Sequence, residues 1–126
     1  MQSFKHRVCD PKSGRTLEAT VTRVGHDLVI VVGGGSEPHV GSLVLAQPHA
    51  SFADPRRSSV SISVLTIPPH KEEPVARCIA EAVCRTFGRV TVVTAGIHEE
   101  NLDPEGIELY LELAKRMAAD LASREL

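Results

Sequence analysis

Three histidines of this sequence lie in short segments that glycine or proline interrupts, and each has a carboxylate close by in the chain. The histidines are His39, His70 and His98, and the neighbouring carboxylates are Glu37, Glu72 or Glu73, and Glu99 or Glu100. An imidazole beside a carboxylate can hydrogen-bond a polar ligand or, where several such groups converge, coordinate zinc or manganese. The histidines occur singly, with no His-x-His or His-x-x-x-His pair, so a metal site is the weaker hypothesis. Histidines that are exposed or that only hold turns are the remaining alternative.

The first segment, Gly33–Gly41, connects two apolar runs that are expected to be strands. It is longer than the about two to five residues that a hairpin connection usually needs. Glycine lets the backbone approach a partner closely, because it has no Cβ atom. We therefore predict a binding loop, and the alternative is a strained hairpin that binds nothing. The candidate ligand contacts in this loop are Gly34, Gly35, Glu37, His39 and Gly41.

The second segment, His70-Lys71, comes just before an expected helix in which Pro74 suits the first turn. Free N–H groups at the start of a helix favour an anionic group, so this segment is the best candidate to bind a phosphate or carboxylate. Lys71 could add a charge-assisted hydrogen bond. The third segment is the expected loop from residue 96 to residue 102, and we predict that all three segments meet in one pocket. Its candidate ligand contacts are Gly96, His98 and Asn101.

Sequence patterns typical of catalytic sites are missing. The serine in the first segment lacks the Gly-x-Ser-x-Gly context of a nucleophile elbow, and the glycines match neither a dinucleotide-binding loop nor a P-loop. Cys78 and Cys84 fall within an expected helix, on or near its buried face, so reactive thiols are not expected there. We therefore predict no catalytic residues.

The composition is that of a soluble globular protein of one domain spanning residues 1–126, with 42% hydrophobic and 24% charged residues. A net charge of -2 and an aromatic content of 3% argue against nucleic-acid binding. No apolar run is long enough for a membrane span. Three cysteines without a Cys-x-x-Cys pair favour free thiols in the reducing cytoplasm.

The hydrophobic pattern predicts five strands, a helix, a strand and a second helix. The expected strands are residues 3–9, 17–22, 28–32, 42–46, 59–65 and 89–95; the helices are 74–87, ended by Gly88, and 104–123, capped by Asp103. This order indicates an α+β fold with a mostly antiparallel sheet of about six strands and both helices on one face. Residues 47–58 are predicted to be a loop, and the most mobile one.

Three motifs, taken in order, resemble a known small family. They are Gly34-Gly35-x-x-Pro38-His39-x-Gly41, His70-Lys71-Glu72-Glu73-Pro74-Val75-Ala76-Arg77 and Ala95-Gly96-Ile97-His98-x-x-Asn101. Their spacing is similar to that of the prenylated-flavin chaperone family, LpdD-like, whose members include the small D subunit associated with hydroxyarylic acid decarboxylases. The resemblance covers roughly residues 16 to 122.

The resemblance implies a non-catalytic accessory protein that binds prenylated FMN, or a related flavin phosphate, for a UbiD-like decarboxylase. It also implies a fold similar to that of proteasome-assembly chaperones, often as a homodimer. Two other hypotheses stay open: a small metal-dependent enzyme that uses His39, His70 and His98 as ligands, and a pure protein-assembly module that binds no ligand.

Overall fold

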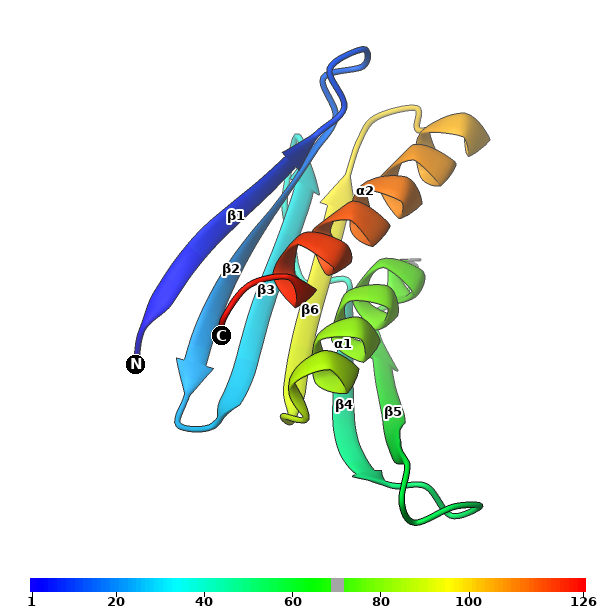
Figure 1. Cartoon of the computed structure of the whole chain (residues 1–126). Helices are drawn as coiled ribbons and strands as arrows, with labels where there is room; N and C mark the ends of the chain where they lie inside the picture. The colour runs from blue at the N-terminus through cyan, green and yellow to red at the C-terminus, as the bar shows by residue number, and fades with distance from the viewer. Residues whose placement is uncertain (69–71) are drawn as a thin grey trace.

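The computed structural model describes residues 1–68 and 72–126, which form one twisted sheet and two helices (Figure 1). The elements are β1 (Ser3–Cys9), β2 (Thr16–Val24), β3 (Asp27–Gly35), β4 (Ser42–Ala50), β5 (Ser58–Thr66), α1 (Glu73–Phe87), β6 (Thr91–His98) and α2 (Pro104–Ala122). This confirms the predicted α+β class and the order of the elements.

The six strands form one sheet in the order β1-β2-β3-β6-β4-β5. All neighbouring strands are antiparallel except β3 and β6, which are parallel. Helix α1 makes the crossover from the β4–β5 hairpin back to β6. Because β3 and β6 run in the same direction, their carboxyl ends lie at one end of the sheet, where the first and third motifs also lie.

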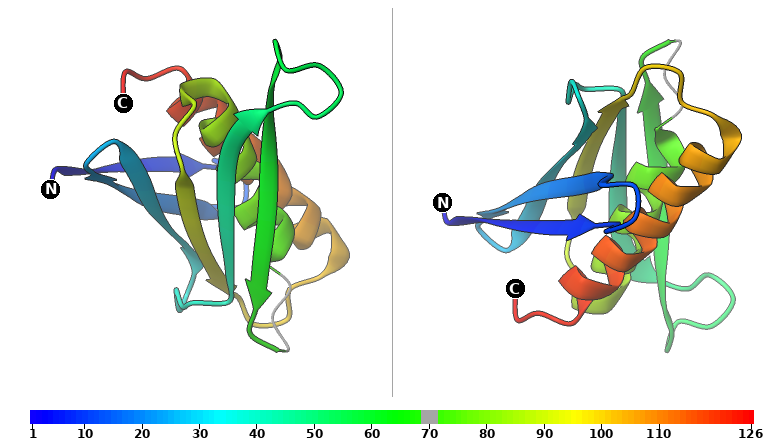
Figure 2. Two further views of the ribbon diagram at one scale, coloured as in Figure 1. Left: turned by 90° about the horizontal axis from the view of Figure 1, so that it is seen from below. Right: turned by 90° about the horizontal axis from the view of Figure 1, so that it is seen from above.

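Both helices cover the same face of the sheet, as predicted (Figure 2). Helix α1 packs on β4, β5 and β6, and α2 packs on β1 and β2. The core lies between the two layers, and its largest fully buried side chains include Leu17, Ile30, Ile79, Leu113 and Met117. Neither helix is long and apolar enough to cross a membrane, and this holds for the part of the chain described here.

Three strands continue into segments that the sequence predicts to be loops. Gly33–Gly35 belong to β3, and residues 96–98 belong to β6, because the parallel ladder continues to the pair Gly35 and His98. These residues were predicted to be loop. Strand β4 likewise continues to Ala50, so the predicted loop 47–58 shrinks to residues 51–57.

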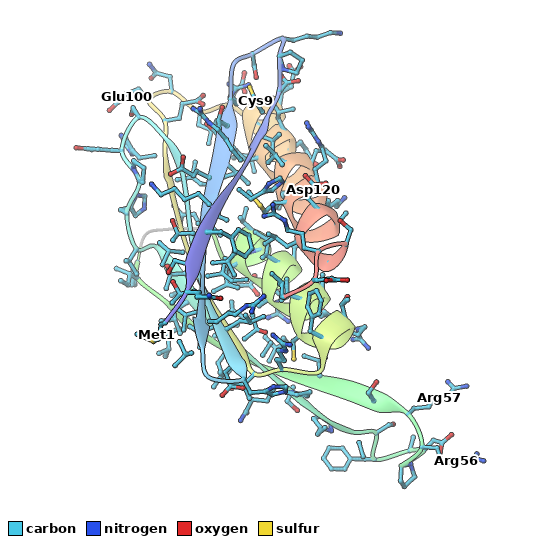
Figure 3. All side chains as sticks on the ribbon, turned by 60° about the vertical axis from the view of Figure 1, so that its left-hand side comes forward. Met1, Cys9, Arg56, Arg57, Glu100 and Asp120 are labelled. Atoms are coloured by element: carbon cyan, nitrogen blue, oxygen red, sulfur yellow. The ribbon has the colours of Figure 1, made fainter. Side chains whose placement is uncertain are left out.

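Pro48 favours a loop at residues 47–58, because proline cannot donate a hydrogen bond to a neighbouring strand. Strand β6 pairs with β4 only over residues 42–46, so beyond Ala46 one side of β4 has no neighbour. Pro48 therefore sits in a part of the strand that has one open edge, where proline is tolerated. This β4–β5 hairpin carries Arg56 and Arg57 to the end of the molecule opposite Glu100 (Figure 3).

Candidate functional site

The first and third motifs meet at the carboxyl ends of β3 and β6. After β3, residues 36–41 cross over the end of β6 and return to begin β4. The Ser36 N–H donates to the His98 carbonyl at 2.8 Å, and the Gly41 N–H donates to the Ala95 carbonyl at 3.0 Å. Two segments that are about 60 residues apart in sequence are thus joined by backbone hydrogen bonds.

Close backbone crossings explain several of the candidate glycines. A Cβ atom on Gly96 would lie 1.6 Å from the His39 carbonyl oxygen, and one on Gly35 would lie 1.9 Å from the His98 carbonyl oxygen. Gly35 also has a φ of 74°, which side chains disfavour. Gly41 has no room for a Cβ either, because the Glu72 carboxylate lies 2.5 Å from that position. These glycines let the protein pack against itself; ligand contacts at Gly34, Gly35, Gly41 and Gly96 stay a prediction.

Glu72 links all three motifs. It comes directly before α1, and only 7% of its surface is exposed. Its Oε1 accepts a hydrogen bond from the Ile97 N–H at 3.3 Å and lies 3.2 Å from Nε2 of His39. From the sequence, Glu72 is expected to lie near His70 and to place its negative charge at the positive end of the helix dipole. The structure instead brings it to His39, a partner that lies 33 residues away.

Both ring nitrogens of His39 face oxygen atoms. Nδ1 donates to the Glu37 carbonyl at 3.1 Å, and Nε2 faces the Glu72 carboxylate. Glu37 therefore contacts His39 through its backbone carbonyl. The residue is exposed to solvent, and a ligand contact at Glu37 stays a prediction.

His98 and Asn101 lie further from this centre. Nε2 of His98 is 3.1 Å from the exposed Glu100 carboxylate, so this pair forms on the surface. Asn101 is exposed and has a φ of 56°. Asparagine tolerates that left-handed conformation better than most residues, which gives it a backbone role in the turn before α2. Ligand contacts at these two residues remain a prediction.

A polar cluster that the sequence did not reveal lies next to the motifs. Arg15 donates from Nε and Nη2 to the Glu99 carboxylate at 3.0 and 2.9 Å, and the Tyr110 hydroxyl donates to Glu99 Oε1 at 2.8 Å. The hydrogen bonds from Arg15, and secondarily from Tyr110, lower the pKa of Glu99. Burial, followed by the hydrogen bond to Glu99, raises the pKa of Tyr110 to about 12. No local sequence pattern indicates the role of the Arg15 side chain, because its partner Glu99 lies 84 residues away in the chain.

Two cavities flank this cluster. The apolar one lies near the end of the molecule where both helices begin, and Figure 1 shows where the two helices start. One, of about 270 Å³, lies between the first turns of α1 and α2 and has apolar walls with Glu72 at one side. The other, of about 340 Å³, is polar and includes Arg7, Arg15 and Ser36. Tyr110 lines both. The apolar cavity is lined by Glu72, Pro74, Val75, Ile97, Leu102, Ile107, Tyr110 and Leu111.

His70 and Lys71 lie outside the described residues, so the predicted phosphate contacts there are not placed. Within residues 1–68 and 72–126, no group of three or more His, Cys, Asp or Glu side chains is arranged to hold a metal ion. The three cysteines are free thiols, of which Cys9 is exposed and Cys84 is buried.

Comparison with known proteins agrees with the motifs. No curated protein matches the chain. Among the solved structures that match is a chaperone complex for yeast 20S proteasome assembly, with a TM-score of 0.58 at 16% identity, over 96% of this chain and 95% of that one. At this identity the likeness supports the fold alone. The model of the prenylated flavin chaperone LpdD-like domain matches residues 11–125. The chain therefore belongs to the LpdD-like family of prenylated flavin chaperones.

Proposed function

We propose that this protein binds prenylated FMN, or a related flavin phosphate, and acts as a non-catalytic accessory protein of a UbiD-like hydroxyarylic acid decarboxylase. Family membership supports the chaperone role. The free thiols and the absence of disulfides fit a role in the cytoplasm. The observation that carries the proposal is the apolar cavity beside Glu72, because residues of the second and third motifs line it: Glu72, Pro74 and Val75 from the second and Ile97 from the third.

The cavity suits the ring system of a prenylated flavin. Its walls are mainly aliphatic side chains from α1, β6 and α2, with the Tyr110 ring as the one aromatic surface. Ligand pockets are typically apolar with a few polar groups that fix orientation. Here the Glu72 carboxylate and the Tyr110 hydroxyl are the polar groups, and both are held in place by hydrogen bonds within the protein.

The phosphate of such a ligand needs a positive environment. The sequence supplies His70 and Lys71 immediately before Glu72, which lines the cavity. Glu99 would oppose an anion at this end of the molecule, but Arg15 neutralises it through a two-pronged ion pair. The protein needs no covalent step for this role: it binds the flavin reversibly, shields its rings from water and releases it to the enzyme.

Titration of the purified protein with prenylated FMN and with FMN, followed by calorimetry or flavin fluorescence, tests this function. We expect saturable binding with one site per chain. If neither flavin binds while the protein still increases the activity of a UbiD-like decarboxylase, the assembly-module hypothesis replaces this one. Elemental analysis tests the metal-enzyme hypothesis, which requires a stoichiometric metal bound by His39, His70 and His98.

A substitution in the wall tests the cavity itself. Ile107 is half exposed at its rim, so Ile107→Trp can fill the cavity without disturbing the core. We expect flavin affinity to fall at least about tenfold, because the added ring occupies the space of the ligand. Leu109→Trp is the matched control, since Leu109 lies on the same helix but lines a different groove. Equal affinities in the two variants would place the flavin elsewhere.

A further inference from the structure

The β4–β5 hairpin extends beyond the rest of the sheet. Strand β6 pairs with β4 only as far as Ala46, whereas β4 stays paired with β5 as far as Ala50. We call residues 47–59 the hairpin arm. Among the described residues, no side chain of the hairpin arm belongs to the hydrophobic core or packs against it. The arm thus projects from the body of the molecule, as Figure 3 shows at the labelled Arg56 and Arg57.

Hydrogen bonds within the tip of the arm hold its backbone in place. The Ser51 N–H donates to the Arg57 carbonyl at 2.8 Å and closes the loop between the two strands. The Asp54 N–H donates to Ser51 Oγ at 3.4 Å. The Asp54 carboxylate in turn accepts from the Arg56 N–H and from Arg56 Nε, both at 3.1 Å. Because these contacts already order the tip, it loses little conformational entropy when a partner binds it.

Phe52 lies at this tip and is 95% exposed, a higher fraction than that of any other large apolar side chain in the described residues. Its ring lies beside the His49 ring, with 5.0 Å between the centroids. Nε2 of His49 is 2.7 Å from Ser61 Oγ, so the imidazole beside Phe52 is itself held in place. Burial of a phenylalanine is favourable, because it removes roughly 150–250 Å² of surface from water. Phe52 is therefore available as an anchor for a partner.

The same tip carries a positive charge. The side chains of Arg56 and Arg57 are 91% and 82% exposed, and Asp54 pairs with both. Two arginines and one aspartate give the hairpin arm a charge of +1, whereas the whole chain carries -2, so the remainder carries -3. The arm is a cationic projection on an anionic molecule, and it therefore favours contact with an acidic surface.

We propose that the hairpin arm docks on an acidic protein surface that holds an apolar pocket, with Phe52 in the pocket and Arg56 and Arg57 against carboxylates at its rim. Aromatic residues and arginine are enriched in interfaces, where a few buried anchors supply most of the binding energy. This inference rests on the proposed function in one respect: the protein that carries the acidic surface is the decarboxylase. None of the arm residues lines the apolar cavity, so docking and flavin binding can be tested separately.

A membrane is the other kind of surface that an aromatic ring beside arginines can meet. An anionic leaflet attracts each basic residue by only about 1 kcal/mol, and stable attachment takes two signals. The arm offers one phenyl ring and a charge of +1. A protein pocket surrounds the ring and pairs each guanidinium with a carboxylate, so it suits the arm better.

Binding of a purified, ligand-free UbiD-like decarboxylase to this protein, measured by interferometry, tests the proposal. We expect Phe52→Ser and Arg57→Glu each to raise the dissociation constant at least about tenfold, because each removes a contact at the centre of the interface. Lys12→Glu is the matched control for charge. It changes the net charge by the same amount, but in the exposed turn between β1 and β2, at the other end of the molecule (Figure 1). It should bind like the wild type.

Fluorine NMR of the wild type reads the pocket directly. The chain has three phenylalanines, so protein made with 4-fluorophenylalanine gives three resonances, and the one missing from Phe52→Ser belongs to residue 52. Adding the decarboxylase should shift this resonance and leave those of Phe4 and Phe87 nearly unchanged.

Circular dichroism checks that each variant is folded. Variants that bind the decarboxylase as tightly as the wild type, or a Phe52 resonance that does not move in the complex, would overturn the docking proposal alone. A wild type that does not bind the decarboxylase contradicts it as well, and so does Phe52-dependent binding to vesicles of phosphatidylcholine and phosphatidylserine. If the wild type binds no flavin but still binds the decarboxylase through Phe52 and Arg57, the flavin site is wrong and the docking proposal is supported.

Discussion

The Glu72 carboxylate does not cap the helix that it precedes. It turns inward to the Ile97 N–H and to His39, and so ties the start of α1 to the end of β6. A buried hydrogen bond to a charged group is worth more than a neutral one, about 1.5–3 kcal/mol. The Glu72 carboxylate is therefore a structural centre of the site as well as part of the cavity wall.

The cluster of Arg15, Glu99 and Tyr110 leads to a prediction about the ionisation of the Tyr110 hydroxyl. Tyr110 is the only tyrosine, and the chain has no tryptophan, so near-ultraviolet absorbance reports its ionisation alone. Its pKa is raised from 10.0 to about 12 in the folded protein. Because the folded pKa is above the unfolded one, the stabilisation is complete below about pH 10 and is lost as the pH rises towards about 12. We expect a tyrosinate midpoint near 12 in the folded protein and near 10 in denaturant.

Glu99→Gln provides the control for this titration. The amide oxygen can still accept the Tyr110 hydrogen bond, but the negative charge that disfavours tyrosinate is gone. The midpoint should therefore fall, and burial alone should keep it above 10. An ordinary midpoint in the folded wild type would show that the hydroxyl is not held in this cluster.

At the scale of elements, the crossing of residues 36–41 over β6 depends on the absence of a side chain at residue 96. Gly96→Ala would place a Cβ 1.6 Å from the His39 carbonyl oxygen, so the backbone must move. We expect the free energy of unfolding, measured in urea, to fall by about 3 kcal/mol, at the upper end of the range for overpacking.

Gly88→Ala is the comparison for this change. Gly88 ends α1 with a φ of 63°, but a Cβ there meets nothing within 4 Å. Only the strain of a left-handed conformation remains, about 1 kcal/mol. If the two variants were equally stable, residues 36–41 would be able to move away from a side chain at residue 96. The close contact with the His39 carbonyl would then not explain the glycine at residue 96.

Periodicity predicted the identity and order of all eight elements, because alternating and helical apolar patterns are local properties of the chain. The strand ends were less predictable. Glycines at 33–35 and 96 favour loops locally, but here they continue a ladder whose crowded backbone excludes side chains. The contacts of Arg15 and Glu72 could not be predicted either, since they depend on the order in which distant strands join the sheet.

At the scale of the whole molecule, the proposed ligand site lies on one side of the sheet. The apolar cavity lies in the helical layer at the end where α1 and α2 begin. Leu43, on β4, is not among its lining residues. The opposite face of the sheet can therefore be altered without touching the proposed ligand site.

This separation leads to a prediction about the folded protein as a unit. Ligand binding raises stability by about 2.7 kcal/mol at 100 times the dissociation constant. Prenylated FMN at that concentration should thus stabilise the wild type and a Leu43→Glu variant by nearly the same amount, whereas Ile107→Trp should gain little. Urea unfolding of the three proteins with and without the flavin checks this. If the folded Leu43→Glu variant lost the stabilisation as Ile107→Trp does, the ligand site could not lie within the helical layer alone.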